Sequence, residues 1–282
     1  MGGRRSHHGR ESSTGKGRES RSSGRGESRT EPVREARAKT LDRVLSRAGI
    51  CSRTVAREWI RAGRVSVGGA PVIDPERWID ARRDEVTLDG RRVAGKSRVY
   101  LALNKPKGVL TSHGDPRGRR TVYAFLGQIE EWVVPVGRLD RDTSGLLLLT
   151  NDTDWAERVA APGHHVPKTY RAQVAPRLDE AALERLRRGV ELEDGPTRPA
   201  IVTRIRDAGA TSIVEITISE GRNRQVRRML REVGGKVREL KRVAIGALEL
   251  GSLPSSKWRR LAAAEVRGVF AERAVTIVRE GK

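Results

Sequence analysis

Four consecutive leucines, Leu146–Leu149, form a short apolar segment between Gly145 and the polar pair Asn151-Asp152. A run of this length between turn-forming residues is typical of a strand buried on both faces. Other periodic segments predict strands at 99–103, 168–174, 198–206, 211–219 and 237–250 and a helix at 179–189. Many strands with few helices between them predict an α+β fold with a mixed, mainly antiparallel sheet flanked by helices.

Between Thr40 and about Asp89 the pattern predicts two short helices followed by strands. One buried helical face is expected from Leu41, Val44, Leu45 and Ala48, with the helix ending at Gly49. Ser52 can cap the second helix, whose inward residues are expected to be Val55, Trp59 and Ala62. Another face carries Arg53, Arg57, Arg61 and Arg64. Such a face is either simply solvated or, being poor in acids, suited to a phosphate backbone.

Residues 1–38 are rich in Gly, Ser, Arg and Glu and contain almost no large apolar side chains. Such a segment cannot bury enough surface to offset its chain entropy, so we expect a disordered basic tail. It carries ten Lys/Arg against five Asp/Glu, a surplus of +5 that leaves +16 for the rest of the chain. The tail is either a loose RNA tether or a solubilising extension.

The net charge of the chain indicates the kind of molecule that it binds. The chain of 282 residues has a formal net charge of +21, which indicates a polyanionic partner, and no apolar run approaches the length of a membrane-spanning helix. Nucleic acid is therefore expected, and no membrane. The single cysteine, Cys51, excludes an internal disulfide and fits a reducing cytoplasm, while the five histidines lack the spacing of metal ligands.

Candidate chemistry lies directly before the leucine strand, in the sequence GRLDRDTSGLLLLTND at 137–152. Asp140 stands where a loop meets the core, and a carboxylate held rigid and partly desolvated there can act as a nucleophile or an acid/base group. A plain turn is the alternative, because Asp, Ser, Thr and Gly all favour turns.

The stretch resembles the signature of the ribosomal RNA pseudouridine synthases of the small-subunit synthase A type, G-R-L-D-x-D-[ST]-x-G-L-L-[LI]-[LFM]-T-N-D. Three further motifs of that family are matched in order: N-K-P-x-G-V at 104–109, K-x-Y at 168–170 and G-R-N-R-[QE]-[VI]-R-R-[ML] at 221–229. The segment RVLSRAGICSRTVAREWIRAGRVSVGGAPV resembles the S-four-type (alpha-L) RNA-binding domain. Taken with the composition of the first 38 residues, these resemblances predict a tail at 1–38, an RNA-binding domain at 39–97 and a synthase catalytic domain at 98–282.

The resemblance also implies roles for individual residues. Asp140 would be the nucleophile, attacking either the ribose or the pyrimidine ring. Tyr170 would stack on the target base and Arg227 would pair with Asp140. The substrate pocket would be lined by Arg138, Leu139 and Leu248. RNA contacts would come from Arg53, Arg57, Arg61, Lys105, Lys107, Arg224 and Arg228. No cofactor and no metal are implied.

The function so implied is the isomerisation of uridine to pseudouridine in ribosomal RNA, with 23S rRNA preferred and 16S rRNA as the alternative. We expect a cytoplasmic monomer that binds rRNA or ribosome assembly intermediates. Two rivals stay open at this point. A non-catalytic RNA-binding or assembly protein explains the charge equally well, and a tRNA-modifying synthase would act on free tRNA.

Overall fold

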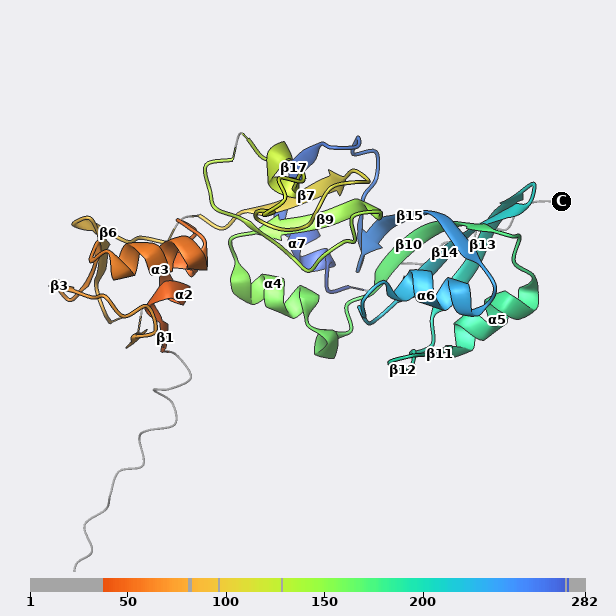
Figure 1. The fold of residues 1–282 in the computed structure, drawn as a ribbon, viewed down its shortest axis with the longest axis horizontal. Coiled ribbons are helices and arrows are strands. Elements are labelled where there is room, and N and C mark those ends of the chain that lie inside the picture. The colour runs from red at the N-terminus through yellow and green to blue at the C-terminus, as the bar shows by residue number, and fades with distance from the viewer. Residues whose placement is uncertain (1–37, 81–82, 96, 128, 272, 274–282) are drawn as a thin grey trace, which may run out of the picture. The chain divides into compact units, whose positions relative to one another are not determined.

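The computed structural model describes residues 38–80, 83–95, 97–127, 129–271 and 273 (Figure 1). The predicted tail, apart from Ala38, lies outside the described residues. No helix in the described ranges is both long enough and apolar enough to cross a membrane.

The first described part pairs two helices with a small sheet. The helices are α2 (Leu41–Arg47) and α3 (Arg53–Arg61). The four-stranded sheet has the order β3 (Ala70–Pro71), β2 (Val65–Val67), β5 (Val86–Leu88) and β6 (Arg91–Arg92), and β1 (Lys39–Thr40) pairs with β4 (Trp78–Ile79). The predicted cap is confirmed, because the Ser52 hydroxyl accepts a hydrogen bond from the Val55 amide. The inward face of α3 was predicted partly wrongly: Ala56 and Ile60 are fully buried, whereas Ala62 ends the helix in solvent.

The second part is built on a nine-stranded sheet that is antiparallel except where β9 and β15 pair. Its main path has the order β13 (Ile201–Ala208), β14 (Thr211–Ile218), β10 (Lys168–Ala175), β15 (Lys236–Ile245), β9 (Ser144–Thr150), β7 (Tyr100–Lys105) and β17 (Trp258–Arg260). The short strands β16 (Leu248–Glu249) and β8 (Val134–Pro135) pair with β15 and β9, and β11 (Glu191–Leu192) and β12 (Gly195–Pro196) form a separate hairpin. The predicted α+β class with a mixed sheet is confirmed.

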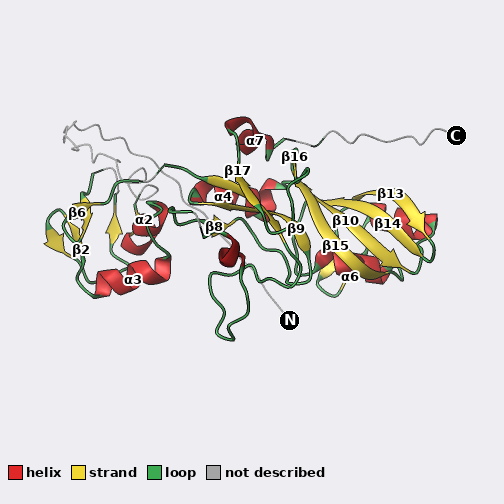
Figure 2. Cartoon of the chain, turned by 90° about the horizontal axis from the view of Figure 1, so that it is seen from above, coloured by secondary structure: helices red, strands yellow, loops and turns green. Residues whose placement is uncertain are grey.

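The leucines of β9 are buried on both faces of the sheet, as predicted. Leu146 and Leu148 pack in one apolar cluster, and Leu147 and Leu149 pack in another. Because successive side chains of a strand point to opposite faces, four buried leucines in a row require cover on both sides. The strand is therefore fixed in the middle of the domain (Figure 2), and the loop that precedes it begins from a rigid base.

Helices cover the sheet. They are α4 (Thr153–Ala160), α5 (Glu180–Arg188), α6 (Gln225–Glu232) and α7 (Ala263–Gly268). Helix α6 buries the predicted apolar face of Val226, Met229, Leu230 and Val233 against the half of the sheet that contains β10 and β14. Of the arginines on α6, Arg227 contacts Asp142 in the loop before β9, and Arg228 contacts Asp194 beside the β11–β12 hairpin.

Candidate active site

A cavity of about 150 Å³ opens at the junction of β9 and β15. Its walls come from the loop before β9, the end of α4, strands β10 and β15 and the loop before α6. The charged and polar side chains that line it are Arg138, Asp140, Thr143, Lys168, Tyr170, Glu220, Arg222, Arg224, Gln225 and Arg242. Three motifs far apart in the sequence thus contribute to one site, and Leu139 lines it as well.

Asp140 lies in the loop that leads into β9. Its side chain is 30% exposed, and its Oδ2 lies 3.7 Å from Nη1 of Arg224. The backbone of the loop is closed on itself, since the Thr143 amide donates to the Asp140 carbonyl at 3.1 Å. The carboxylate therefore faces the cavity from a fixed backbone, close to a cation but without a direct hydrogen bond to it.

The Lys105 side chain holds the backbone of the loop that contains Asp140. Its side chain is completely buried, and its Nζ donates to the carbonyls of Thr143 at 2.8 Å, Asp140 at 3.1 Å and Pro106 at 3.1 Å. The expectation that Lys105 contacts RNA is wrong, because the end of β7 places the side chain under the loop instead of at the surface. Burial lowers the pKa of Lys105 to about 8.

We expect Lys105→Met to lower the free energy of unfolding by about 3 kcal/mol at pH 7, because several buried carbonyls lose their donor. Lys105 has its pKa lowered from 10.5 to about 8 in the folded state. The wild type should therefore gain stability relative to the variant as the pH rises from about 8 to 10.5. Urea unfolding at pH 7.5 and pH 10 measures both effects. The matched control is Lys107→Met, on an exposed neighbour, which should change stability by less than about 0.5 kcal/mol.

The predicted partner of the catalytic acid lies against a different carboxylate. Arg227 places its Nε 3.5 Å from Oδ2 of Asp142 and donates from Nη2 to the Asp142 carbonyl at 2.9 Å. Arg224 holds the same carboxylate through two hydrogen bonds of 2.9 and 3.0 Å, which keep the pKa of Asp142 below its usual range. The cation nearest to Asp140 is thus Arg224, and Asp142 positions both arginines.

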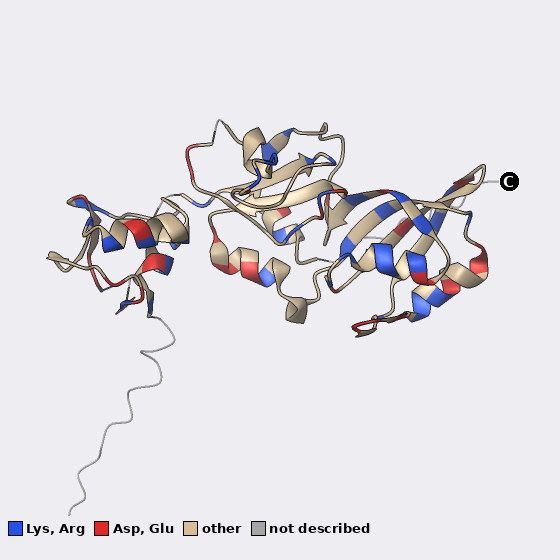
Figure 3. Cartoon of the chain, in the orientation of Figure 1, with Lys and Arg blue, Asp and Glu red and all other residues tan. Residues whose placement is uncertain are grey.

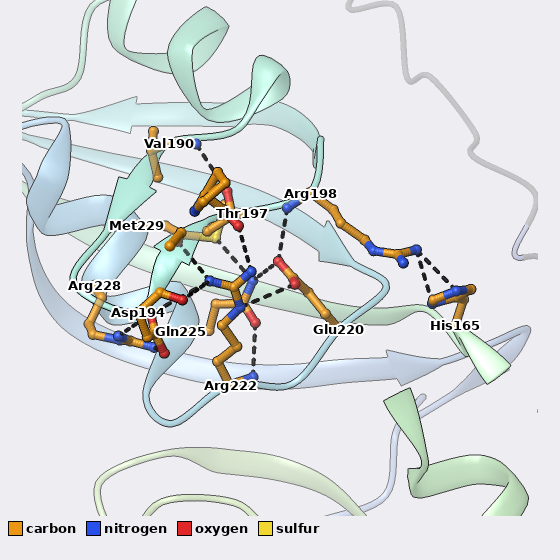
Figure 4. A network of polar contacts seen from close by, with 12 residues as sticks. His165, Val190, Asp194, Thr197, Arg198, Glu220, Arg222, Gln225, Arg228 and Met229 are labelled. Carbon is orange, nitrogen blue, oxygen red and sulfur yellow. Dashed lines mark hydrogen bonds and ion pairs between the residues drawn. The ribbon is translucent and has the colours of Figure 1, made fainter. Parts of the chain in front are cut away.

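The loop before α6 is anchored by a polar network (Figure 4). The amide group of Gln225 donates to the Glu220 carboxylate and its oxygen accepts from the Arg222 amide. Arg222 also donates to carbonyls of the β11–β12 hairpin, including that of Gly195 at 2.7 Å. Arg228, expected to contact RNA, is bound through both terminal nitrogens to Asp194 on that hairpin and is only 17% exposed. Its charge is largely neutralised within the protein.

Tyr170 shares the cavity with two residues for which the sequence suggested no role. It lies on β10, directly opposite Arg242 of β15. Arg242 is 4% exposed, and Lys168 lines the cavity two residues before Tyr170. The sequence does contain a sign that Arg242 is special. Arg242 alternates along the strand with Leu240 and Ala244, which are buried, so it occupies a position where an apolar residue is expected.

The expected pocket residue Leu248 lies elsewhere. The chain reverses direction after Ile245, and Leu248 on β16 packs into the apolar cluster that contains Trp155 and Val159. The apolar residues of β15 in the cavity wall are instead Leu240 and Ile245. Leu248 is therefore not among the residues that line this cavity.

More arginines of the α3 face are paired with carboxylates than the sequence indicates. Arg53 and Arg57 both donate to Oδ2 of the buried Asp42, at 2.7 and 2.8 Å. Burial raises the pKa of Asp42, but the hydrogen bonds from Thr40, Arg53 and Arg57 outweigh it and hold the pKa below its ordinary value. Arg64 forms an ion pair with Asp89, so the exposed Arg61 is the member of the face without such a partner in the described residues.

The described residues contain no group of three or more His, Cys, Asp or Glu side chains placed to hold a metal ion.

The sequence matches two known families. Residues 99–232 match the RNA pseudouridylate synthases, and residues 39–77 match the S4 domain.

Curated relatives and a solved structure extend this similarity to most of the chain. An uncharacterized RNA pseudouridine synthase of Aquifex aeolicus (strain VF5) is 41% identical over 231 residues, which cover 82% of this chain and 93% of that protein. The ribosomal large subunit pseudouridine synthase B of Bacillus subtilis (strain 168) is 39% identical over 229 residues, covering 80% and 93%. A crystal structure of a pseudouridylate synthase superposes with a TM-score of 0.59 at 32% identity, over 82% of this chain and 99% of that one.

Proposed function

Because the chain belongs to the RNA pseudouridylate synthase family and is a pseudouridine synthase, we propose that it isomerises a uridine of the large-subunit, 23S ribosomal RNA. The observation that carries this proposal is one cavity that Asp140, Tyr170 and Arg224 line from three separate motifs. The relatives of Bacillus subtilis and Vibrio cholerae named for the large ribosomal subunit support the choice of rRNA.

The reaction needs no redox change. The bond between N1 of uracil and C1′ of ribose breaks, the base turns, C5 bonds to C1′, the C5 proton leaves and N1 takes up a proton. In our proposal the uridine is flipped out of its RNA helix into the cavity and Asp140 is the nucleophile. Tyr170 stacks on the base, an interaction worth about 1–3 kcal/mol that offsets part of the cost of unstacking. Arg224 and Arg227, oriented by Asp142, balance the charge of the nucleophile.

A basic groove beside the cavity suits the RNA on either side of the target. It is lined by Asn223, Arg224, Arg227, Arg228, Arg231, Gly234, Gly235, Lys236 and Val237 and has a volume of about 510 Å³. Lys and Arg are concentrated on α6 and the neighbouring strands (Figure 3). Arg231 and Lys236 are exposed there, and Arg61 and Lys107 are exposed elsewhere. We propose these side chains as phosphate contacts, in a monomeric enzyme that meets its rRNA, free or in assembly intermediates, in the cytoplasm.

The proposal is tested by incubating the purified full chain with unmodified 16S rRNA, 23S rRNA and tRNA transcripts, without cofactor, and mapping pseudouridine by carbodiimide-dependent primer-extension stops. We expect a new stop in 23S rRNA. A stop confined to 16S rRNA or to tRNA would overturn the choice of substrate but not the reaction. Tight rRNA binding with no stop in any transcript would favour a non-catalytic assembly protein instead.

A further inference from the structure

Arg242, which lines the cavity, carries a buried hydrogen-bond donor that has no partner in the described residues. Its Nε donates to the carbonyl of Leu146 at 2.8 Å, which fixes the guanidinium against β9. Its Nη2 is buried and has no hydrogen-bond partner among the described residues. A buried donor left without an acceptor costs roughly 1–3 kcal/mol. Such a donor inside a substrate cavity indicates that the acceptor arrives with the substrate.

Lys168 adds a second cation with a free donor to the same side of the cavity. It lies on β10 opposite Ile245, two residues before Tyr170, so Lys168, Tyr170 and Arg242 share the cavity face of adjacent strands. Its Nζ has no hydrogen-bond or ion-pair partner in the described part of the chain. Burial, and next the charge of Arg242, lower the pKa of Lys168 to about 8. Two cations placed together against apolar residues require an electron-rich ligand.

The carboxylates of the cavity are not the acceptors for Arg242 and Lys168. Asp140 lies near Arg224, and Glu220 accepts hydrogen bonds from Gln225 and from the Arg198 amide. Within the described residues, neither acid is at ion-pair distance from Lys168 or Arg242. A backbone phosphate is also a poor candidate, because it is tied to the rest of the RNA and remains at the mouth. The group that reaches buried donors is the base itself, through its carbonyl oxygens O2 and O4.

We propose that Arg242 and Lys168 donate hydrogen bonds to the carbonyl oxygens of the flipped uracil and stabilise the negative charge that develops on the ring during the reaction. This inference rests on the proposed function. When the N1–C1′ bond breaks, its electron pair stays on N1 and is delocalised onto O2 and O4. If Asp140 adds to the ring first, the charge again falls on a carbonyl oxygen, so either route of attack needs these donors.

The test compares uridine with 5-fluorouridine at the target position of a short RNA substrate. Fluorine withdraws electrons from the ring and stabilises its anion, so cleavage of the N1–C1′ bond of the fluorinated base depends less on protein donors. Because C5 of that base carries fluorine and no proton, the quantity compared is the loss of the N1-linked nucleoside and not the formation of pseudouridine. We expect Arg242→Gln to slow the single-turnover consumption of uridine by about 10²-fold and that of 5-fluorouridine by about tenfold or less. Lys168→Gln should show the same inequality, and Lys168→Arg should restore most of the rate.

The matched control is Arg238→Gln, an exposed arginine on the same strand, which should leave both rates within about twofold of the wild type. Equal losses with the two substrates, or no loss with either, would overturn the inference while leaving the proposed function intact. A wild type that consumes no uridine would instead overturn the proposed function. If Arg242→Gln fails to fold, Lys168→Gln decides, because the Lys168 side chain makes no hydrogen bond or ion pair within the described residues.

Discussion

Asp140→Asn is expected to lower the rate of pseudouridine formation by about 10⁴-fold or more, because it removes the nucleophile and leaves the rest of the cavity unchanged. Asparagine has nearly the same shape, and the Asp140 carbonyl that accepts from Lys105 belongs to the backbone and is retained. RNA affinity should therefore stay within about threefold of the wild type. Single-turnover pseudouridine mapping and a binding titration on the same RNA measure the two quantities separately.

Asp142→Asn is the matched control, since Asp142 is the second carboxylate of the same loop. It orients Arg224 and Arg227 and, in our proposal, does not react. We expect a loss of about 10- to 10²-fold, well short of that for Asp140→Asn. An Asp140→Asn enzyme within tenfold of the wild type, or an Asp142→Asn enzyme that loses more activity, would exclude Asp140 as the nucleophile.

Much of the fold was predictable because its determinants are local. The run Leu146–Leu149 specifies a doubly covered strand by itself, and the Ser52 cap depends on a hydrogen bond across three residues. The motif around Asp140 also marked the loop that reaches the cavity. In each case the periodicity or the spacing of neighbouring residues contains the physical constraint.

The roles that the sequence misplaced depend on long-range pairing. In the sequence, Lys105 has the features of a surface lysine in a Pro-Gly turn. It is buried because the pairing of β7 with β9 brings it against the backbone of Asp140, 35 residues away. Arg53 and Arg57 read as free cations until α2 brings Asp42 against them. A cationic side chain in a basic protein has many possible partners, and the fold alone decides which carboxylate or carbonyl it meets.

Gly145→Ala is expected to lower the free energy of unfolding by about 4 kcal/mol or more, a large share of the roughly 5–15 kcal/mol that stabilises a typical domain. Gly145 has φ +104, and a Cβ there would lie 2.2 Å from the carbonyl oxygen of Arg242 and 2.7 Å from its amide nitrogen. Neither backbone atom can move without breaking the parallel pairing of β9 with β15, in which Gly145 lies opposite Arg242. Urea unfolding followed by circular dichroism measures the effect.

Gly195→Ala separates the backbone strain at a positive φ from the steric clash of the added Cβ. Gly195 has a similar φ of +95, but no atom lies within 4 Å of the Cβ that the substitution would add. It should therefore cost only the backbone strain, about 1–2 kcal/mol. Equal losses at the two positions would mean that the approach of the strands at Gly145 contributes nothing. A larger loss at Gly145 would show that the absence of a side chain there permits the close approach of β9 and β15, in which Gly145 lies opposite Arg242.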